Sequence, residues 1–149
     1  MRMSLVAIGA HRGKRECEQT LVEEYVKRTG RYVEAKSVWS RSEAEFWGLV
    51  AGASGRSAAK VLLMDSGGKQ LTSVEFARVI GEFQDRGMQE IVVGIGGADG
   101  WSAASRERAD LCISMGKMTL PHGLARVVAA EQIYRAMTIL AGHPYHCGH

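Results

Sequence analysis

The chain contains two glycine-bearing segments that each follow a short apolar run, Ile91–Gly100 and Ile113–His122. Glycine has no side chain, so the backbone N–H and C=O groups of such segments can approach a bound molecule closely. If both apolar runs are neighbouring parallel strands, the two segments meet at the carboxyl edge of one sheet, where α/β proteins bind small ligands. The sequence therefore predicts a small-molecule crevice between these segments.

Two familiar nucleotide-binding motifs do not account for the first segment. Gly94, Gly96 and Gly100 have the spacing G-x-G-x-x-x-G, one residue longer than the dinucleotide fingerprint, and no acidic residue follows about 20 positions later to bind a ribose. A P-loop is excluded because Gly-Lys-Ser/Thr occurs nowhere in the chain. A tight turn between a strand and a helix would also favour glycine, so turn geometry remains an alternative to ligand binding.

Histidine is concentrated near the end of the chain. Four of the five histidines lie in the last 28 residues, at His122, His143, His146 and His149. Zinc could be bound by the last three of these together with Cys147. Their spacing matches no standard ligand pattern, and chain ends seldom form a site in advance. We therefore expect no metal site, and a tail in which His149 and Cys147 have no role.

The order of the apolar patterns predicts an α/β fold with a mainly parallel sheet flanked by helices. At 149 residues, with 46% hydrophobic and 23% charged residues, we expect one domain over 1–149. Strands are predicted at 3–9, 32–39, 61–65, 91–95 and 111–114, and helices at about 14–29, 42–53, 72–85, 102–109 and 124–141.

Capping residues set several of these boundaries. Thr72 and Glu75 have the spacing of a capping box, and Ser42 with Glu45 has the same spacing. Gly142 is expected to end the last helix, because glycine readily adopts the conformation that follows a helix.

Two further local predictions concern packing and chain reversal. Cys17, Leu21 and Tyr25 are four residues apart and are expected to form the inward face of the first helix. Gly67–Gly68 is expected to be a turn that ends the third strand.

Charge and cysteine content give weaker indications. The net charge of +3 does not by itself indicate nucleic-acid binding, but residues 1–60 hold 11 Lys and Arg against 7 Asp and Glu. That excess could face a phosphate backbone, or could be an ordinary solvated surface. Three widely spaced cysteines without a CxxC pattern suggest reduced thiols in the cytoplasm. No apolar run approaches about 18 residues, so we expect no membrane span, and the N-terminal apolar run lacks a cleavage site for a signal peptide.

Several motifs in the second half of the chain resemble one family. The matching segments are Ile95–Gly100, Lys117–His122, Arg126–Val128, Glu131–Ala136 and His143–His146. Together they are similar to the SPOUT-class methyltransferases that methylate N3 of a pseudouridine in 23S ribosomal RNA. The resemblance implies a SPOUT-type fold with a C-terminal trefoil knot, a homodimer, and S-adenosylmethionine as methyl donor.

The resemblance also implies which residues bind the donor. Transferred residue by residue, they are Met64, Gly96, Met115, Gly116, Lys117, Met118, Thr119 and Leu120. Glycine backbone and apolar side chains suit an adenine held by main-chain hydrogen bonds. Asp99 stands where many relatives have Glu, a change that we expect to have little effect.

Methylation of N3 requires that the ring proton leaves as the methyl group arrives. A histidine, or a cation that stabilises the uracil anion, would serve. The candidate catalytic residues are His143, Tyr145, His146 and Arg126. Nine residues separate Arg126 from Arg135, so one helix presents them on opposite faces. Glu131 lies four residues before Arg135, which predicts an ion pair there.

Other functions remain open on these grounds. A SPOUT enzyme acting on transfer RNA, a nucleotide-binding regulatory module without catalysis, and a zinc-binding adaptor are the alternatives. We expect the assembled ribosome as partner, since a chain of 149 residues leaves no room for a separate RNA-binding domain. The last helix is apolar on more than one face, which is the physical indication of a homodimer.

Overall fold

The computed structural model describes residues 1–9 and 17–147. The strands are β1 (Arg2–Ile8), β2 (Glu34–Ser40), β3 (Lys60–Gln70), β4 (Glu90–Ile95) and β5 (Leu111–Ser114). The helices are α1 (Cys17–Thr29), α2 (Glu43–Ala53), α3 (Ser73–Asp85), α4 (Ala103–Arg108) and α5 (His122–Leu140). The strands form one sheet in the order β2-β1-β4-β3-β5 with parallel pairings, which confirms the predicted α/β class.

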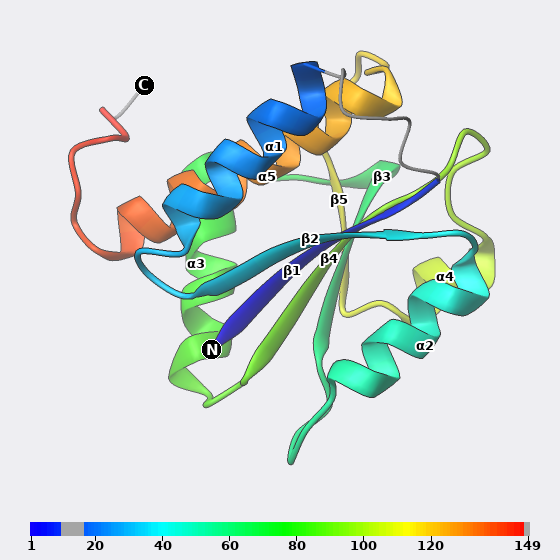
Figure 1. Cartoon of the computed structure of the whole chain (residues 1–149), viewed down its shortest axis with the longest axis horizontal. Coiled ribbons are helices and arrows are strands. Elements are labelled where there is room, and N and C mark those ends of the chain that lie inside the picture. The colour runs from blue at the N-terminus through cyan, green and yellow to red at the C-terminus, as the bar shows by residue number, and fades with distance from the viewer. Residues whose placement is uncertain (10–16, 148–149) are drawn as a thin grey trace.

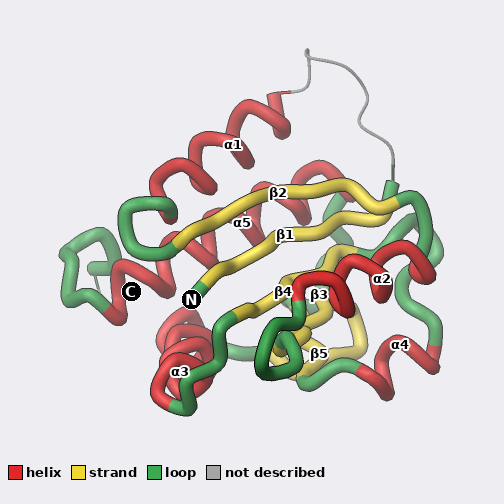
Figure 2. Tube along the Cα trace, turned by 60° about the horizontal axis from the view of Figure 1, so that its bottom comes forward, coloured by secondary structure: helices red, strands yellow, loops and turns green. Residues whose placement is uncertain are grey.

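Helices cover both faces of this sheet (Figures 1 and 2). Helices α1, α3 and α5 lie on one face, and α2 and α4 lie on the other. Alternate side chains of a strand point to opposite faces, so Val93 packs in the core beneath α1, α3 and α5 while Val92 packs in the core beneath α2. Because both faces are covered, β4 is buried at every position, as is typical of central parallel strands.

The predicted helix boundaries are largely confirmed. Thr72 and Glu75 form the complete capping box, and Ser42 accepts a hydrogen bond from the Glu45 N–H at 3.1 Å. Gly142, with φ +71°, follows the end of α5. Helix α5 itself begins at His122, two residues earlier than predicted.

The prediction for the inward face of α1 holds for Tyr25, which packs against the core, but was wrong for Cys17 and Leu21. Leu21 is 45% exposed and Cys17 is exposed, while Val22 is fully buried. Packing against α5 selects the face, through contacts such as Tyr25 with Tyr134 at 6.1 Å between ring centroids. Apolar spacing allows either face, and only the neighbouring helix decides between them. The predicted start of this helix, residues 14–16, lies outside the described residues.

The prediction that Gly67–Gly68 ends the third strand was also wrong. Strand β3 continues to Gln70, and its pairing with β5 shifts, since Met64 and Lys69 both pair with Ile113. The four residues between them, 65–68, form a bulge. At the end of this bulge the backbone of Gly68 returns to lie against β5. A Cβ atom on Gly68 would be 2.6 Å from the backbone of Cys112 and Ile113. The glycine therefore permits a close crossing of two backbones rather than a turn.

The trefoil knot concerns how the chain is threaded. Strand order and register do not specify the threading, so the knot stays a prediction.

In the described part of the chain, no helix has both the length and the apolar character needed to cross a membrane.

The crossing at Gly68 makes a specific prediction. Gly68→Ala should destabilise the protein by about 1–3 kcal/mol, the usual cost of overpacking, because the new Cβ meets backbone that cannot move aside. Thermal or urea unfolding of the purified protein measures this change.

Gly48, inside α2, is the matched control. A Cβ atom there has no neighbour within 4 Å, so Gly48→Ala should stabilise the protein by about 0.4–1 kcal/mol through the unfolded chain. If the two substitutions had the same effect, the close approach at Gly68 would not be a constraint.

Candidate functional site

The site lies where β3, β4 and β5 end. These strands are neighbours in the sheet, so the segments that follow them meet at its carboxyl edge, as predicted. They enclose a cavity of about 430 Å³, which His122 and Ala125 of α5 also line. The other lining residues are Met64, Asp65, Ser66, Ile95, Gly96, Gly97, Ala98, Asp99, Gly100, Ser114, Met115, Gly116, Lys117, Met118, Thr119 and Leu120. All eight predicted donor-binding residues are thus gathered in one place.

Trp101 ties two of these segments together, and the sequence analysis missed it. Its indole Nε1–H donates a hydrogen bond to the Met64 carbonyl at 3.0 Å, which links the end of β3 to the segment after β4. The side chain is only 3% exposed and packs against Phe46, with 4.8 Å between ring centroids. An aromatic residue directly after the glycines was the signal in the sequence.

The glycines of the first segment make room for this indole. A Cβ atom on Gly94 would lie 2.8 Å from Trp101 and 2.9 Å from Phe46. A Cβ atom on Gly96 would lie 3.1 Å from the Trp101 Nε1 atom and 3.2 Å from the Gly100 backbone. Both glycines are therefore required by packing around Trp101, whereas turn geometry accounts for Gly100, which has φ +71°.

A serine shapes the second segment. The Ser114 hydroxyl donates to the Gly116 carbonyl at 3.0 Å and accepts from the Gly116 N–H at 3.2 Å. Gly116 has φ +125°, a conformation that L side chains rarely adopt. Beyond this turn the segment is open, since Met118 is 88% exposed. The hydrogen bonds of Ser114 therefore fix the turn, while the exposed residues after it can contact a ligand.

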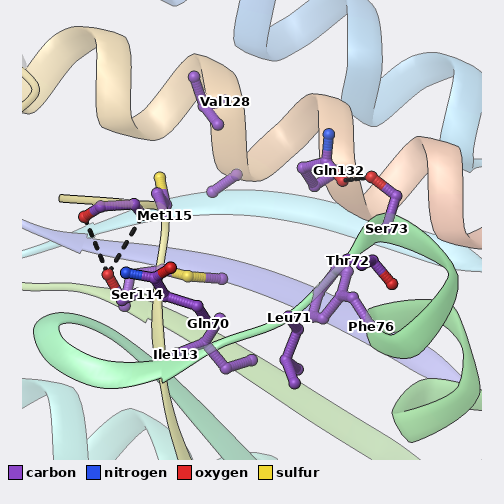
Figure 3. Close-up of a pocket in the computed structure, with 13 residues that line it drawn as sticks. Gln70, Leu71, Thr72, Ser73, Phe76, Ile113, Ser114, Met115, Val128 and Gln132 are labelled. Atoms are coloured by element: carbon purple, nitrogen blue, oxygen red, sulfur yellow. Dashed lines mark hydrogen bonds between the residues drawn. The ribbon is translucent and has the colours of Figure 1, made fainter. Parts of the chain in front are cut away.

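A second cavity of about 310 Å³ adjoins the first (Figure 3). Ser73 of α3 and Gln132 of α5 meet across it through a hydrogen bond of 2.7 Å. The two cavities share the lining residues Met64, Ser114, Met115 and Gly116. A ligand with a flat apolar part and a polar part therefore has room on both sides of the second segment.

Among the described residues, four ionisable side chains line the first cavity, and they differ in burial. Asp99 and Lys117 are exposed, and His122 is partly buried. The Asp65 side chain is only 11% exposed, and its Oδ1 atom is 3.8 Å from Arg106 Nη1. Its Oδ2 atom accepts a hydrogen bond from the Gly67 N–H at 3.1 Å. Asp65 is therefore the carboxylate in this cavity that is best shielded from water.

His143, Tyr145 and His146, the predicted catalytic residues of the tail, do not line this cavity. The Tyr145 hydroxyl donates to Glu131 Oε1 at 3.0 Å, and Arg135 Nη2 is 2.6 Å from the same oxygen. The His146 Nδ1 atom lies 3.1 Å from Arg135 Nη1, and His143 Nδ1 accepts from the Tyr145 N–H at 3.1 Å. The predicted ion pair between Glu131 and Arg135 is confirmed, and it anchors the tail to α5.

The packing of Tyr145 in this tail keeps its phenol protonated. Burial raises the pKa of the phenol, and the hydrogen bond to Glu131 raises it further. Tyr145 therefore keeps its proton at neutral pH and acts as a hydrogen-bond donor, which does not suit it to accept the N3 proton.

Arg126 does not line the cavity either. It is 1% exposed, and its guanidinium lies 4.0 Å from the centroid of a Trp39 ring. It donates to Gln19 Oε1 at 3.0 Å and to Ser37 Oγ at 3.1 Å. Arg126 thus joins α5 to α1 and β2, on the side of the helix opposite to Arg135.

Within one chain, the cavity and the tail are therefore apart. Ala125 lines the cavity and Arg135 holds the tail, ten residues further along the same helix. At 1.5 Å per residue, this separation is about 15 Å along the helix axis. A catalytic role of the tail at this cavity requires another arrangement than the one inside a single chain.

Metal ligands do not gather in the described part of the chain. Among residues 1–9 and 17–147, no three His, Cys, Asp or Glu side chains are placed to hold a metal ion. His149 lies outside these ranges.

Two solved structures share this fold. The SpoU methyltransferase AviRb from Streptomyces viridochromogenes, in complex with AdoMet, superimposes with a TM-score of 0.50 and 12% identity over 95% of this chain and 58% of that chain. A probable methylase family protein from Haemophilus influenzae superimposes with a TM-score of 0.56 and 8% identity over 97% of this chain and 70% of that chain. The architecture is thus that of SpoU-type methyltransferases.

Sequence comparison identifies the family. The family described as "Predicted SPOUT methyltransferase" matches residues 1–146. The Ribosomal RNA large subunit methyltransferase H of Koribacter versatilis is 46% identical over 149 residues, the full length of both chains. The protein of the same name from Allorhizobium ampelinum is 54% identical over 86 residues, 58% of this chain and 54% of that protein. The chain belongs to the SPOUT methyltransferase family.

Gly96→Val should abolish binding of S-adenosylmethionine at this site. The valine side chain would collide with Trp101 and the Gly100 backbone, and would push the first segment out of place. Titration calorimetry on the folded variant measures the affinity.

Gly97→Ala is the control in the same segment. A Cβ atom there makes only an ordinary contact of 3.6 Å with Ile8, so a smaller loss of affinity is expected. Unchanged affinity in a folded Gly96→Val protein would contradict the assignment of the cavity.

Proposed function

We propose that this chain transfers a methyl group from S-adenosylmethionine to N3 of a pseudouridine in the 23S RNA of the large ribosomal subunit. The observation that carries the proposal is the gathering of all eight expected donor-binding residues around one cavity at the ends of β3, β4 and β5. The full-length relative named Ribosomal RNA large subunit methyltransferase H supports the substrate class. We place both donor binding and catalysis in a single domain, 1–149, of a cytoplasmic protein.

Donor binding follows from the chemistry of the cavity walls. Backbone groups of the two glycine-bearing segments can hydrogen-bond an adenine, and Met64 and Met115 offer apolar contact. The methyl group leaves the sulfonium, which becomes a neutral thioether, and forms a bond to N3 as the N3 proton leaves. One tail histidine, His143 or His146, takes that proton on its Nδ1 atom, after the hydrogen bond that this atom accepts within the chain has been released.

This role of the tail leads to a homodimer. Within one chain the tail is held at the far part of α5, so we propose that a second copy brings its tail to the cavity. Leu21 of α1 and Leu124 of α5 are each 45% exposed, on helices that pack together. Exposed apolar side chains on two helices that pack together are suited to contact a second copy.

The assembled ribosome is the proposed form of the substrate. The basic excess of residues 1–60 would meet the phosphate backbone, while the second half carries the chemistry. The surrounding ribosomal shape would position the target uridine.

Methyl transfer from labelled S-adenosylmethionine tests the substrate. We expect label to enter the 23S RNA of whole ribosomes, with less in isolated large subunits and least in free RNA. Digestion of the product to nucleosides should show N3-methylated pseudouridine. Labelling of transfer RNA alone would overturn the proposal.

Removal of residues 143–149 should leave folding and donor binding intact but slow methyl transfer about 10²–10⁴-fold, as is typical when acid–base catalysis is lost. His146→Ala should account for part of this loss, and His149→Ala for almost none. Single-turnover methylation of ribosomes at saturating donor measures these rates. A full rate for the truncated protein would move the search for the catalytic group to His122, which lines the cavity.

Mixing two inactive variants tests whether the tail acts across the dimer. The truncated chain keeps its cavity, and the Gly96→Val chain keeps its tail. If the tail acts on the partner's cavity, a mixture of the two should regain part of the activity. Sedimentation that shows only monomers at micromolar concentration would contradict the dimer.

A further inference from the structure

The donor and its product differ in charge. S-adenosylmethionine carries a sulfonium, an ammonium and a carboxylate, so its net charge is +1. S-adenosylhomocysteine has lost the sulfonium charge and is neutral overall. A shielded charge in the cavity would therefore discriminate between the two, whereas apolar contacts with the shared adenine would not.

Asp65 has the placement that such discrimination requires. It lines the first cavity at the end of β3, and β3 lies between β4 and β5, so the carboxylate stands between the two glycine-bearing segments. The bulge after Met64 holds it there, with the Gly67 N–H donating to Oδ2 at 3.1 Å. At 11% exposure, its charge is screened far less by water than that of a surface carboxylate.

Other charged groups around the cavity act more weakly. Asp99 and Lys117 are exposed and of opposite sign, so their fields are screened and partly cancel. In the described part of the chain, Asp65 forms an ion pair with Arg106, at 3.8 Å between Nη1 and Oδ1, and the Arg106 side chain is 45% exposed. The same Nη1 atom donates to the Trp101 carbonyl at 2.9 Å. Arg106 therefore offsets only part of the negative charge of Asp65.

We propose that the Asp65 carboxylate makes the cavity prefer the positively charged methyl donor over its neutral product, and that Arg106 moderates this preference. The inference rests on the proposed function, because it assigns a selecting group to the same donor site. Its effect is to help donor replace product after each turnover. Asp65 acts through its field over several ångströms, so direct contact with the sulfonium is not required.

Calorimetric titration of Asp65→Asn with S-adenosylmethionine and with S-adenosylhomocysteine tests the proposal. Asparagine has nearly the same shape, and its oxygen can still accept from the Gly67 N–H. We expect the affinity for the donor to fall about tenfold, which is ~1.4 kcal/mol, and the affinity for the product to change less than threefold. An unchanged melting temperature would show that the variant is folded.

Two further variants sharpen the test. Arg106→Gln removes the neighbouring cation and should change selectivity in the opposite direction, increasing the preference for donor over product. Asp99→Asn removes a carboxylate from the exposed rim of the same cavity and should shift the preference less than Asp65→Asn, because water screens it. Higher salt should leave the effect of Asp65→Asn largely intact.

The outcomes separate the two proposals. Equal loss of both ligands in Asp65→Asn would indicate a contact with a group that both share, such as the ribose or the ammonium, and would overturn charge selection. No change in either affinity would overturn it as well. If the unaltered protein bound neither ligand, the proposed function itself would fail.

Discussion

The hydrogen bond from the Trp101 indole to the Met64 carbonyl is the interaction on which the site depends. It joins the end of β3 to the segment after β4, in a part of the chain where no strand pairing remains to hold them. The absence of side chains at Gly94 and Gly96 leaves space for the indole. A buried donor with a partner is costly to disrupt, so the glycine-bearing segment is held in place before any ligand arrives.

The bulge in β3 has a related effect at the neighbouring strand. By looping out after Met64 and returning to pair with β5, the chain brings Asp65 to the cavity and Gly68 against the β5 backbone. Because β4 ends opposite Met64, Asp65 already lies at the carboxyl edge of the sheet. The bulge adds the Gly67 N–H, which donates to its carboxylate and helps to hold it there.

Helix α5 lines the cavity near its start and anchors the tail near its end. Its first turns line the cavity, its next turn buries Arg126 between α1 and β2, and its last turns hold the tail through Glu131 and Arg135. A rigid helix keeps its two ends apart, and this is the reason for proposing that the tail acts at the first cavity of another copy.

The sequence by itself determined the alternation of strands and helices, the capping box at Thr72, and the two segments that form the cavity. These features depend on residues close together in the chain, so periodicity and spacing reveal them. The sequence could not determine which face of α1 is buried, why Gly68 is a glycine, or that Trp101 reaches Met64. Each depends on contact between segments far apart in sequence, which only the order and curvature of the sheet bring together. The same holds for the tail, because only the fold shows that Ala125 lines the cavity and that the tail folds back onto Glu131 and Arg135.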